Sequence, residues 1–379
     1  MRRSLSCVVL AAGLLAGSAW GLSQEPASRP ATSPVRVTLN LDNVSAQEAF
    51  DHLARQVGID LIVDDPNIFA QADLVSLNVK DAPFWPTFIK LCQSSGLSFD
   101  QGNNYGQTRV RSIRLAKFGN GENPLSRRPM AEAEGFVLMA TGAQRNYNIN
   151  YEAAGNSSSS FWVQLMVLPE PGLHVVSISQ PTLSEAVDEN GLSLLPTGNN
   201  SMSYGNQPNQ FIQQAALSLS YPSKGGRKVA RLKGQLQATA LVRAEKIEID
   251  NPLTAKPVTK DLPDYVVVIS PLKRVNQNYQ VKVTFRAKKN PQATGGVRRG
   301  ATRDYWSLAN TIELTDADGR RYGNGGSSGG GGNAGSYECT MNYSPQGNAV
   351  GAPTKLSWNL PAETKEIVVP FEMKDLPIP

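Results

Sequence analysis

Two short acidic motifs are the places where this sequence of 379 residues comes closest to a ligand-binding site. Asp316-Ala317-Asp318-Gly319 is similar to the opening of a calcium-binding loop, and Asp188-Glu189-Asn190-Gly191 is its counterpart nearer the N-terminus. A calcium loop needs further oxygen ligands at fixed spacing and a closing bidentate glutamate, and neither motif is followed by them. An Asp-Gly pair also makes a tight hairpin turn, because glycine supplies the positive φ. We therefore favour turns and keep calcium at Asp316 and Asp318 as the alternative.

The sequence carries no recognisable catalytic constellation. Its two histidines, His52 and His174, have no partners at the spacing of metal ligands. The glycine-rich residues 323–333 lack the Lys-Ser/Thr pair and helix start of a phosphate-binding loop, so we predict a flexible loop there. We predict a non-enzymatic protein without cofactor or metal. A hydrolase built on a sandwich stays open as a third hypothesis, since paired carboxylates need no sequence motif.

The first 21 residues are typical of a secretory signal peptide. Arg2 and Arg3 precede the apolar stretch Val8–Leu15, which is too short to span a membrane and is followed by small residues. A linker rich in proline and serine occupies residues 22–34, and no later segment has the apolar length of a transmembrane helix. We expect an exported protein that is periplasmic or envelope-associated, and exposure at the cell surface stays open.

Two cysteines remain after the signal peptide. Cys92 follows Phe88 by one helical turn on an apolar face, and Cys339 alternates with Tyr337 and Met341 on the inward face of a predicted strand. Both are typical of buried small hydrophobic residues, and they fall in different predicted domains, so we expect no disulfide. The fold must therefore depend on its hydrophobic cores.

Four residues are candidates for binding a partner: Phe84, Trp85, Arg109 and Arg111. The two arginines share one face of a predicted strand, and a solvated strand face is the simpler explanation for them. A nucleic-acid site would need a larger basic patch with aromatic platforms, and the net charge of +5 is weak, so we predict no nucleic-acid partner. The aromatic pair falls in the first turn of a predicted helix and could anchor a protein, because tryptophan is enriched in hot spots. Packing of Trp85 into the core is the interpretation that we favour.

Two segments 38 residues apart follow the same plan. Val37–Val44 aligns without a gap with Val75–Ala82, and Gly58 aligns with Gly96. In the first copy, alternating apolar residues predict a strand, the capping motif Ser45-Ala46-Gln47-Glu48 begins a helix, and Gly58 ends it before a second strand. The sequence therefore predicts a duplicated strand–helix–strand unit, completed by a hairpin.

This pattern resembles the secretin and TonB short N-terminal domain over residues 35–117. The resemblance is carried by Leu39-Asn40-Leu41-Asp42-Asn43-Val44 and Gly58-Ile59-Asp60-Leu61-Ile62-Val63, with their second copies Leu77-Asn78-Val79-Lys80-Asp81-Ala82 and Gly96-Leu97-Ser98-Phe99. It implies a small periplasmic α/β module that makes protein–protein contacts and has no catalytic role. Secretins continue into ring-building domains, and TonB-dependent receptors into a long series of membrane strands. Neither pattern follows here.

The remaining residues predict β-structure throughout. Residues 118–134 are expected to form a second linker, followed by immunoglobulin-like β-sandwiches at 135–258 and 259–379. A second, looser duplication relates the two sandwiches, because the Asp-Gly motifs and several strand sequences recur at a similar spacing. The predicted fold class is multidomain, with a small α+β module (a duplicated βαβ unit) followed by two all-β immunoglobulin-like sandwiches.

The leading hypothesis is an exported, non-enzymatic envelope protein whose residues 35–117 dock an envelope protein, while the sandwiches act as scaffold or second binding surface. The alternative is a carbohydrate- or cell-wall-binding protein that uses the sandwich loops. Its sugar platforms would be aromatic residues in the two sandwiches, namely Tyr204, Trp306, Tyr322 and Tyr343. The alternation of residues around Tyr343 predicts that this side chain faces inward, which counts against the alternative.

Overall fold

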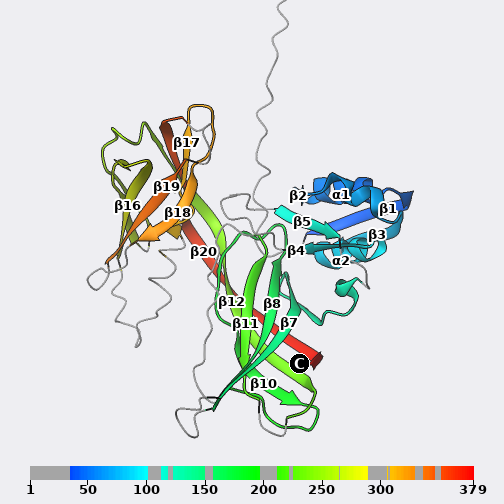
Figure 1. Cartoon of the computed structure of the whole chain (residues 1–379). Helices are drawn as coiled ribbons and strands as arrows, with labels where there is room; N and C mark the ends of the chain where they lie inside the picture. Colours follow the sequence, from blue (N-terminus) through cyan, green and yellow to red (C-terminus); the bar gives the residue numbers. More distant parts are fainter. Residues whose placement is uncertain are drawn as a thin grey trace, which may run out of the picture.

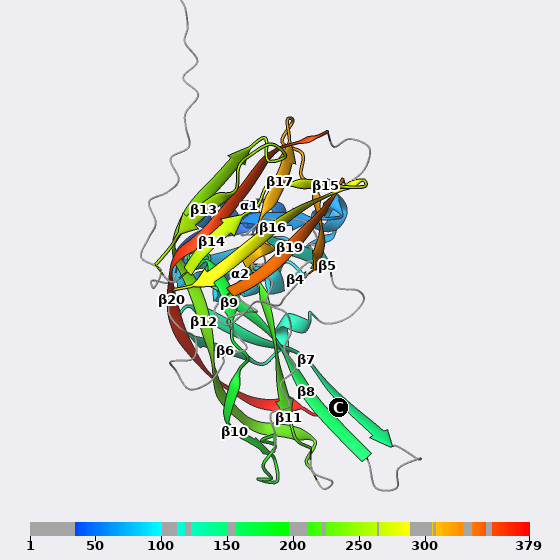
Figure 2. The same cartoon turned by 90° about the vertical axis from the view of Figure 1, so that its left-hand side faces the viewer.

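The computed structural model describes the chain in the ranges 35–100, 112–117, 123–149, 157–196, 211–221, 225–263, 265–288, 305, 308–328, 336–345 and 351–379. Most residues in these ranges lie in β-strands, and both of their α-helices are near the N-terminus, so the predicted β-rich character is confirmed. A small α/β module lies beside a larger body of long strands (Figure 1, Figure 2). The predicted signal peptide and the linker at 22–34 lie outside the described residues.

The module contains both copies of the strand–helix–strand unit. The first copy consists of β1 (Arg36–Val44), α1 (Ala46–Val57) and β2 (Asp60–Val63). After the 3-10 turn η1 (Pro66–Gln71), the second copy follows as β3 (Val75–Pro83), α2 (Phe84–Ser94) and β4 (Leu97–Asp100), and β5 (Ser112–Lys117) completes the module. Strand β5 lies between β2 and β4, parallel to the first and antiparallel to the second. The predicted hairpin thus forms from β4 and β5.

Strands β1 and β3 pair with each other, so the two copies meet along equivalent strands. Asn40 and Asn78 occupy the same position in the two copies and lie directly opposite each other in the antiparallel ladder. One face of this two-stranded sheet carries buried residues such as Val37 and Leu39 against the helices, and the other face is exposed. The two copies are therefore related by a local two-fold axis that passes between β1 and β3.

Two reciprocal hydrogen bonds confirm that the copies fold alike. The N–H of Asn43 donates to Ser76 Oγ over 2.9 Å, and the N–H of the equivalent Asp81 donates to Thr38 Oγ1 over 3.1 Å. Asn43 and Asp81 both have positive φ angles, 53° and 50°, a conformation that asparagine and aspartate tolerate better than most residues. The same strained position therefore recurs in both copies.

Three sheets form the body. The four-stranded sheet has the order β11-β8-β7-β6 and consists of β6 (Met130–Ala133), β7 (Phe136–Ile149), β8 (Ser157–Pro169) and β11 (Gln213–Leu219). The five-stranded sheet has the order β10-β12-β20-β17, with β9 paired to β12, and consists of β9 (Val175–Ile178), β10 (Thr182–Asp188), β12 (Lys228–Asp250), β17 (Glu313–Asp316) and β20 (Pro353–Pro377). The six-stranded sheet has the order β13-β14-β16-β19-β18, with β15 paired to β16, and consists of β13 (Val258–Asp261), β14 (Tyr265–Ile269), β15 (Lys273–Val275), β16 (Asn278–Ala287), β18 (Gly323–Ser328) and β19 (Ser336–Ser344).

The long strands β12 and β20 pair with each other over almost their whole length and hold the body together. Their antiparallel register places Lys228 opposite Pro377 at one end and Asp250 opposite Lys355 at the other. The first half of β12 and the second half of β20 pack against the four-stranded sheet, and the opposite halves pack against the six-stranded sheet. The body therefore consists of two sandwiches that share the central five-stranded sheet. Each sandwich contains one half of β12 and one half of β20.

This exchange corrects the predicted domain boundary at residues 258 and 259. Val369 and Met373 belong to the core of the first sandwich although they are near the C-terminus, and Ile247 and Ile249 belong to the core of the second. The chain crosses between the two cores inside both long strands. No glycine or proline marks the crossing in β12, whereas Pro361 and a register shift of the ladder lie beside the crossing in β20. Because both crossings lie within continuous strands, no linker separates the two cores.

Two predicted loops are also corrected in part. The predicted linker at 118–134 contains β6 and the buried Leu125, because the Asn123 amide group donates to the Leu97 carbonyl oxygen over 2.7 Å and fixes the segment under α2. The predicted glycine loop at 323–333 begins with β18, which pairs with β19. Glycine content suggested flexibility, but hydrogen bonding to a neighbouring strand overrides it.

Cys92 and Cys339 are both buried and free, in different cores, as the sequence predicted. Within the part of the chain that the structure describes, neither helix is long and apolar enough to cross a bilayer.

Gly234 allows β12 to pack tightly against its neighbours in the shared sheet. A Cβ atom at this position would collide with the Thr182 carbonyl oxygen and lie 2.8 Å from Phe371 Cζ. We predict that Gly234→Ala lowers the free energy of unfolding by about 1–3 kcal/mol, because a backbone oxygen cannot move aside at low cost. Urea denaturation measures this, with Gly142→Ala as control, since its Cβ would meet only the end of the Gln164 side chain at 3.4 Å. Equal effects of the two substitutions would contradict the packing argument.

Candidate functional site

Phe84 and Trp85 begin α2 and are both completely buried. The Trp85 indole Nε1–H donates to the Pro169 carbonyl oxygen over 2.8 Å, and its ring stacks on Phe211 with centroids 5.8 Å apart. Pro169 and Phe211 belong to the first sandwich, so Trp85 fixes the module to the body. The hypothesis that this pair is an exposed anchor for another protein is therefore corrected, and burial is what the structure shows.

The contact between module and first sandwich, which we call the Trp85 joint, has a continuous apolar core. Sandwich residues that join the core of the module are Val137, Met139, Met166, Leu168, Phe211 and Ile212. Phe88 and Phe99 flank Trp85 with ring centroids 5.8 Å from it. Aromatic clusters of this kind dominate interface energetics, so the module cannot leave the sandwich without exposing a large apolar surface.

Glu170 is a buried carboxyl group at the edge of the Trp85 joint, directly after Pro169. Only 5 % of the residue is exposed, and within the described residues its Oε2 atom has no hydrogen-bond partner. Burial is the main effect and raises the pKa of Glu170 to about 7. The Val35 N–H, which donates to the carboxyl group, lowers this pKa; the charge of Glu132 raises it and the charge of Arg36 lowers it. In the sequence Glu170 stands between two prolines, and its burial depends on the distant module.

Arg109 and Arg111, the other two candidate residues, lie outside the described residues. The nearest described basic residue, Arg114 on β5, forms an ion pair with Asp64 Oδ2 over 2.9 Å. Lys117 donates from Nζ to Gln71 Oε1 over 2.6 Å. The described part of this basic stretch thus makes contacts within the module.

Asp316 forms the predicted turn and uses both carboxylate oxygens to do so. Its Oδ1 accepts from the N–H groups of Asp318 and Arg320 at 3.0 and 2.8 Å, and its Oδ2 accepts from Gly351 N–H at 2.9 Å. The Gly351 amide, helped by the other two, lowers the pKa of Asp316 in spite of its burial. The carboxylate thus binds main-chain amides, and no group of three metal-ligating side chains gathers among the described residues.

Asp188 repeats this arrangement in the first sandwich. It accepts from the N–H groups of Asn190 and Leu192 through Oδ1 and of Gly226 through Oδ2, at 2.9, 2.8 and 2.6 Å. Each donor is the counterpart of one that binds Asp316. The two motifs therefore tie a turn to a glycine in a later segment, which is a structural role.

Two of the four aromatic residues proposed as sugar platforms are buried. Tyr343 is 1 % exposed, and Tyr322 is 7 % exposed and donates to the Gly351 carbonyl oxygen. Trp306 and Tyr204 lie outside the described residues. No described feature therefore favours the carbohydrate-binding alternative.

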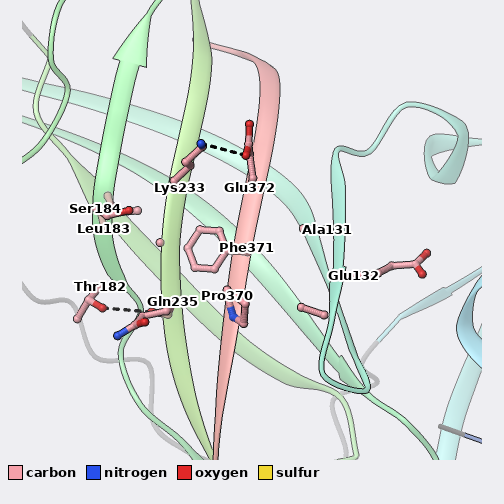
Figure 3. A pocket seen from close by; sticks show the side chains of 12 residues that line it. Ala131, Glu132, Thr182, Leu183, Ser184, Lys233, Gln235, Pro370, Phe371 and Glu372 are labelled. Carbon is pink, nitrogen blue, oxygen red and sulfur yellow. Dashed lines mark hydrogen bonds and ion pairs between the residues drawn. The ribbon is translucent and has the colours of Figure 1, made fainter.

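A cavity of about 730 Å³ lies between β6 and the shared sheet, beside Gly234. Lys233 and Glu372 point toward each other at its rim and form an ion pair at 3.2 Å, while Glu132 points away from them (Figure 3). Lys233 lowers the pKa of Glu372 through this hydrogen bond. The ion pair offsets the charges of Lys233 and Glu372, which leaves Glu132 as the other charged side chain of the lining.

The outer edges of β1 and β3 have no pairing strand among the described residues of the module. In antiparallel pairing, alternate residues direct both main-chain groups away from the neighbouring strand. On β1, Gln56 caps this edge: its amide accepts from Thr38 N–H at 3.2 Å and donates to Thr38 O at 2.8 Å. The equivalent residue in the second copy is Ser94, which donates to Lys90 O within its own helix over 2.9 Å.

Among the described residues, the strand edge of the second copy therefore has no such cap. Among the described residues no strand pairs with β3 on the side away from β1. Leu74, which precedes the strand, is 60 % exposed, and Asn78 and Lys80 are exposed along it. We define this surface, Leu74 to Lys80 on the outer side of β3, as the β3 edge. An alignment of the two copies shows Gln56 opposite Ser94, and this difference is the sequence signal that could have located the edge.

No family model, curated protein or solved structure matches this chain.

Removing the indole N–H should weaken the Trp85 joint. We predict that Trp85→Phe lowers the free energy of unfolding by about 1–3 kcal/mol, because the Pro169 carbonyl oxygen loses its donor inside a dry contact. Trp162→Phe, at a partly buried position of β8, is the matched control and should change stability by less than about 0.5 kcal/mol. Urea denaturation followed by circular dichroism measures both, and a Trp85→Phe protein as stable as the control would contradict this role.

Glu170 should make stability depend on pH near neutrality. The folded protein holds the Glu170 proton up to about pH 7, whereas the unfolded chain releases it near 4.5. The folded state therefore binds more protons in this window, and stability falls as pH rises through it. We predict that Glu170→Gln removes this decrease and makes the protein more stable than wild type at pH 8 but not at pH 5. Urea midpoints measure the difference, with the exposed Glu134→Gln as control; parallel profiles for all three proteins would refute the prediction.

Proposed function

We propose that this chain is an exported, non-enzymatic protein of the cell envelope whose N-terminal module docks a protein partner. In this proposal residues 35–117 are a member of the secretin and TonB short N-terminal family. The two sandwiches are immunoglobulin-like and serve as scaffold or second binding surface. The signal-like N-terminus and the duplicated strand–helix–strand plan support the proposal.

The observation that carries the proposal is the difference between two equivalent strand edges. An unpaired edge is a template for a strand from another chain, and proteins usually cover such edges. Gln56 covers the edge of β1, but Ser94 does not cover the edge of β3. Strand addition would supply main-chain hydrogen bonds for affinity, and Leu74 would supply an apolar contact at one end.

The Trp85 joint supports the same assignment. Because the joint uses the start of α2, the module binds the body through one side and leaves the β3 edge exposed. A module fixed in this way presents a rigid strand, and rigid presentation reduces the entropy lost on binding.

Proline substitution on the two edges tests the proposal. Asn78→Pro removes an outward N–H from β3, and Asn40→Pro is the matched control at the equivalent position of β1, beside the edge that Gln56 caps. The purified full-length variants are used to capture envelope proteins from the native host after mild crosslinking. We expect a partner that wild type and Asn40→Pro retain and Asn78→Pro loses. Loss with both variants, or with neither, would contradict docking at the β3 edge, provided that urea denaturation shows equal stability.

A further inference from the structure

A second open surface lies where β7 continues beyond β6. A groove of about 620 Å³ is lined there by Arg127–Pro129, by Ala140–Ala143 and Val163, and by Leu376–Pro379. Its charged side chains are the two arginines, and no carboxylate side chain lines it. The groove is therefore apolar with a positive charge at one end.

Arg128 is a half-buried cation that has no carboxylate partner among the described residues. Its Nη1 donates to the Met139 sulfur at 3.7 Å, and a thioether is a weak acceptor. Burial lowers the pKa of Arg128, as expected for a guanidinium group that has lost water without obtaining a counter-ion. A guanidinium offers five donors in a planar fork that matches a carboxylate, so Arg128 is prepared for an anionic group.

The same groove opens onto an unpaired strand edge. Strand β6 pairs with β7 only as far as Ala140, whose N–H donates to the Pro129 carbonyl oxygen over 2.9 Å. From Thr141 to Ile149, β7 pairs with β8 on one side and with no described strand on the other. Figure 2 shows β7 and β8 extending together beyond the rest of the body. The described residues of this hairpin include Arg145 and no aspartate or glutamate.

From the uncompensated Arg128 and the open edge of β7 beside it, we infer that this surface binds an extended acidic peptide segment of another protein by strand addition. The peptide lies antiparallel to β7 where β6 ends, and one of its carboxylates pairs with Arg128. The inference rests on the proposed role of the sandwiches as a second binding surface and names the ligand class for it. Charge complementarity selects an acidic segment over a neutral or basic one.

The test uses a fluorescein-labelled ten-residue peptide of alternating valine and glutamate, titrated with the purified full-length protein and followed by anisotropy. We expect saturable binding that Arg128→Gln weakens at least about tenfold, since one charge-assisted pair is lost. Arg243→Gln, an exposed arginine on β12, is the matched control and should bind as wild type. A peptide with lysine in place of glutamate should not bind.

Backbone methylation of the peptide separates strand addition from simple attraction of charge. N-methyl groups on alternate residues block the hydrogen-bond donors along one edge of a strand. Methylation of the odd residues and methylation of the even residues give two phases of the peptide, and only one of these phases should abolish binding. Equal binding of both phases, equal loss with Arg128→Gln and Arg243→Gln, or a dimer in analytical ultracentrifugation that competes with the peptide would overturn the inference. The titration uses two pure components and does not involve the β3 edge, so its failure is distinct from a failure of the capture experiment.

Discussion

Antiparallel pairing between equivalent strands is the interaction on which the whole architecture depends. In the module, the duplicated strands β1 and β3 pair so that Asn40 faces its counterpart Asn78. In the body, β12 and β20 begin 125 residues apart at Lys228 and Pro353, and Ala240 lies opposite Lys365 at that same spacing. A duplicated strand can pair antiparallel with its own copy about a two-fold axis, because the same register then satisfies the hydrogen bonds of both strands. Both duplications have used this solution, and it explains why neither sandwich is a separate unit.

The exchange between β12 and β20 also determines where stability resides. Each strand contributes apolar residues to both cores, so neither sandwich can unfold without breaking the ladder that it shares with the other. Ion pairs such as Lys228 with Asp375 and Lys355 with Glu248 follow this ladder, but exposed pairs of this kind contribute little. The buried half-strands therefore provide most of the stability against unfolding, and we expect the body to unfold cooperatively.

The sequence predicted the local features well and the long-range ones poorly. The serine cap at Ser45, the left-handed Gly58 and the second copy of the unit depend on residues within one helix or hairpin. The burial of Cys92 and Cys339 followed from apolar periodicity in the same way. The crossing of β12 into the second sandwich depends on a partner strand more than a hundred residues away, so the sequence gives no local sign of it. Glu170 was missed for the same reason, since its burial comes from a module that precedes it by a long stretch of chain.

The Trp85 joint determines which surfaces of the module stay accessible. Because Trp85 and Phe84 are buried against the first sandwich, the module cannot use them for another protein, and we propose that the β3 edge serves instead. The joint also holds the β3 edge and the β7 edge on one rigid scaffold. A partner that pairs with both edges would bind the second one as an intramolecular event, at an effective concentration set by the length between its two segments. A firm apolar joint is what such bivalent binding requires, because a loose one would lose that advantage to the entropy of the connection.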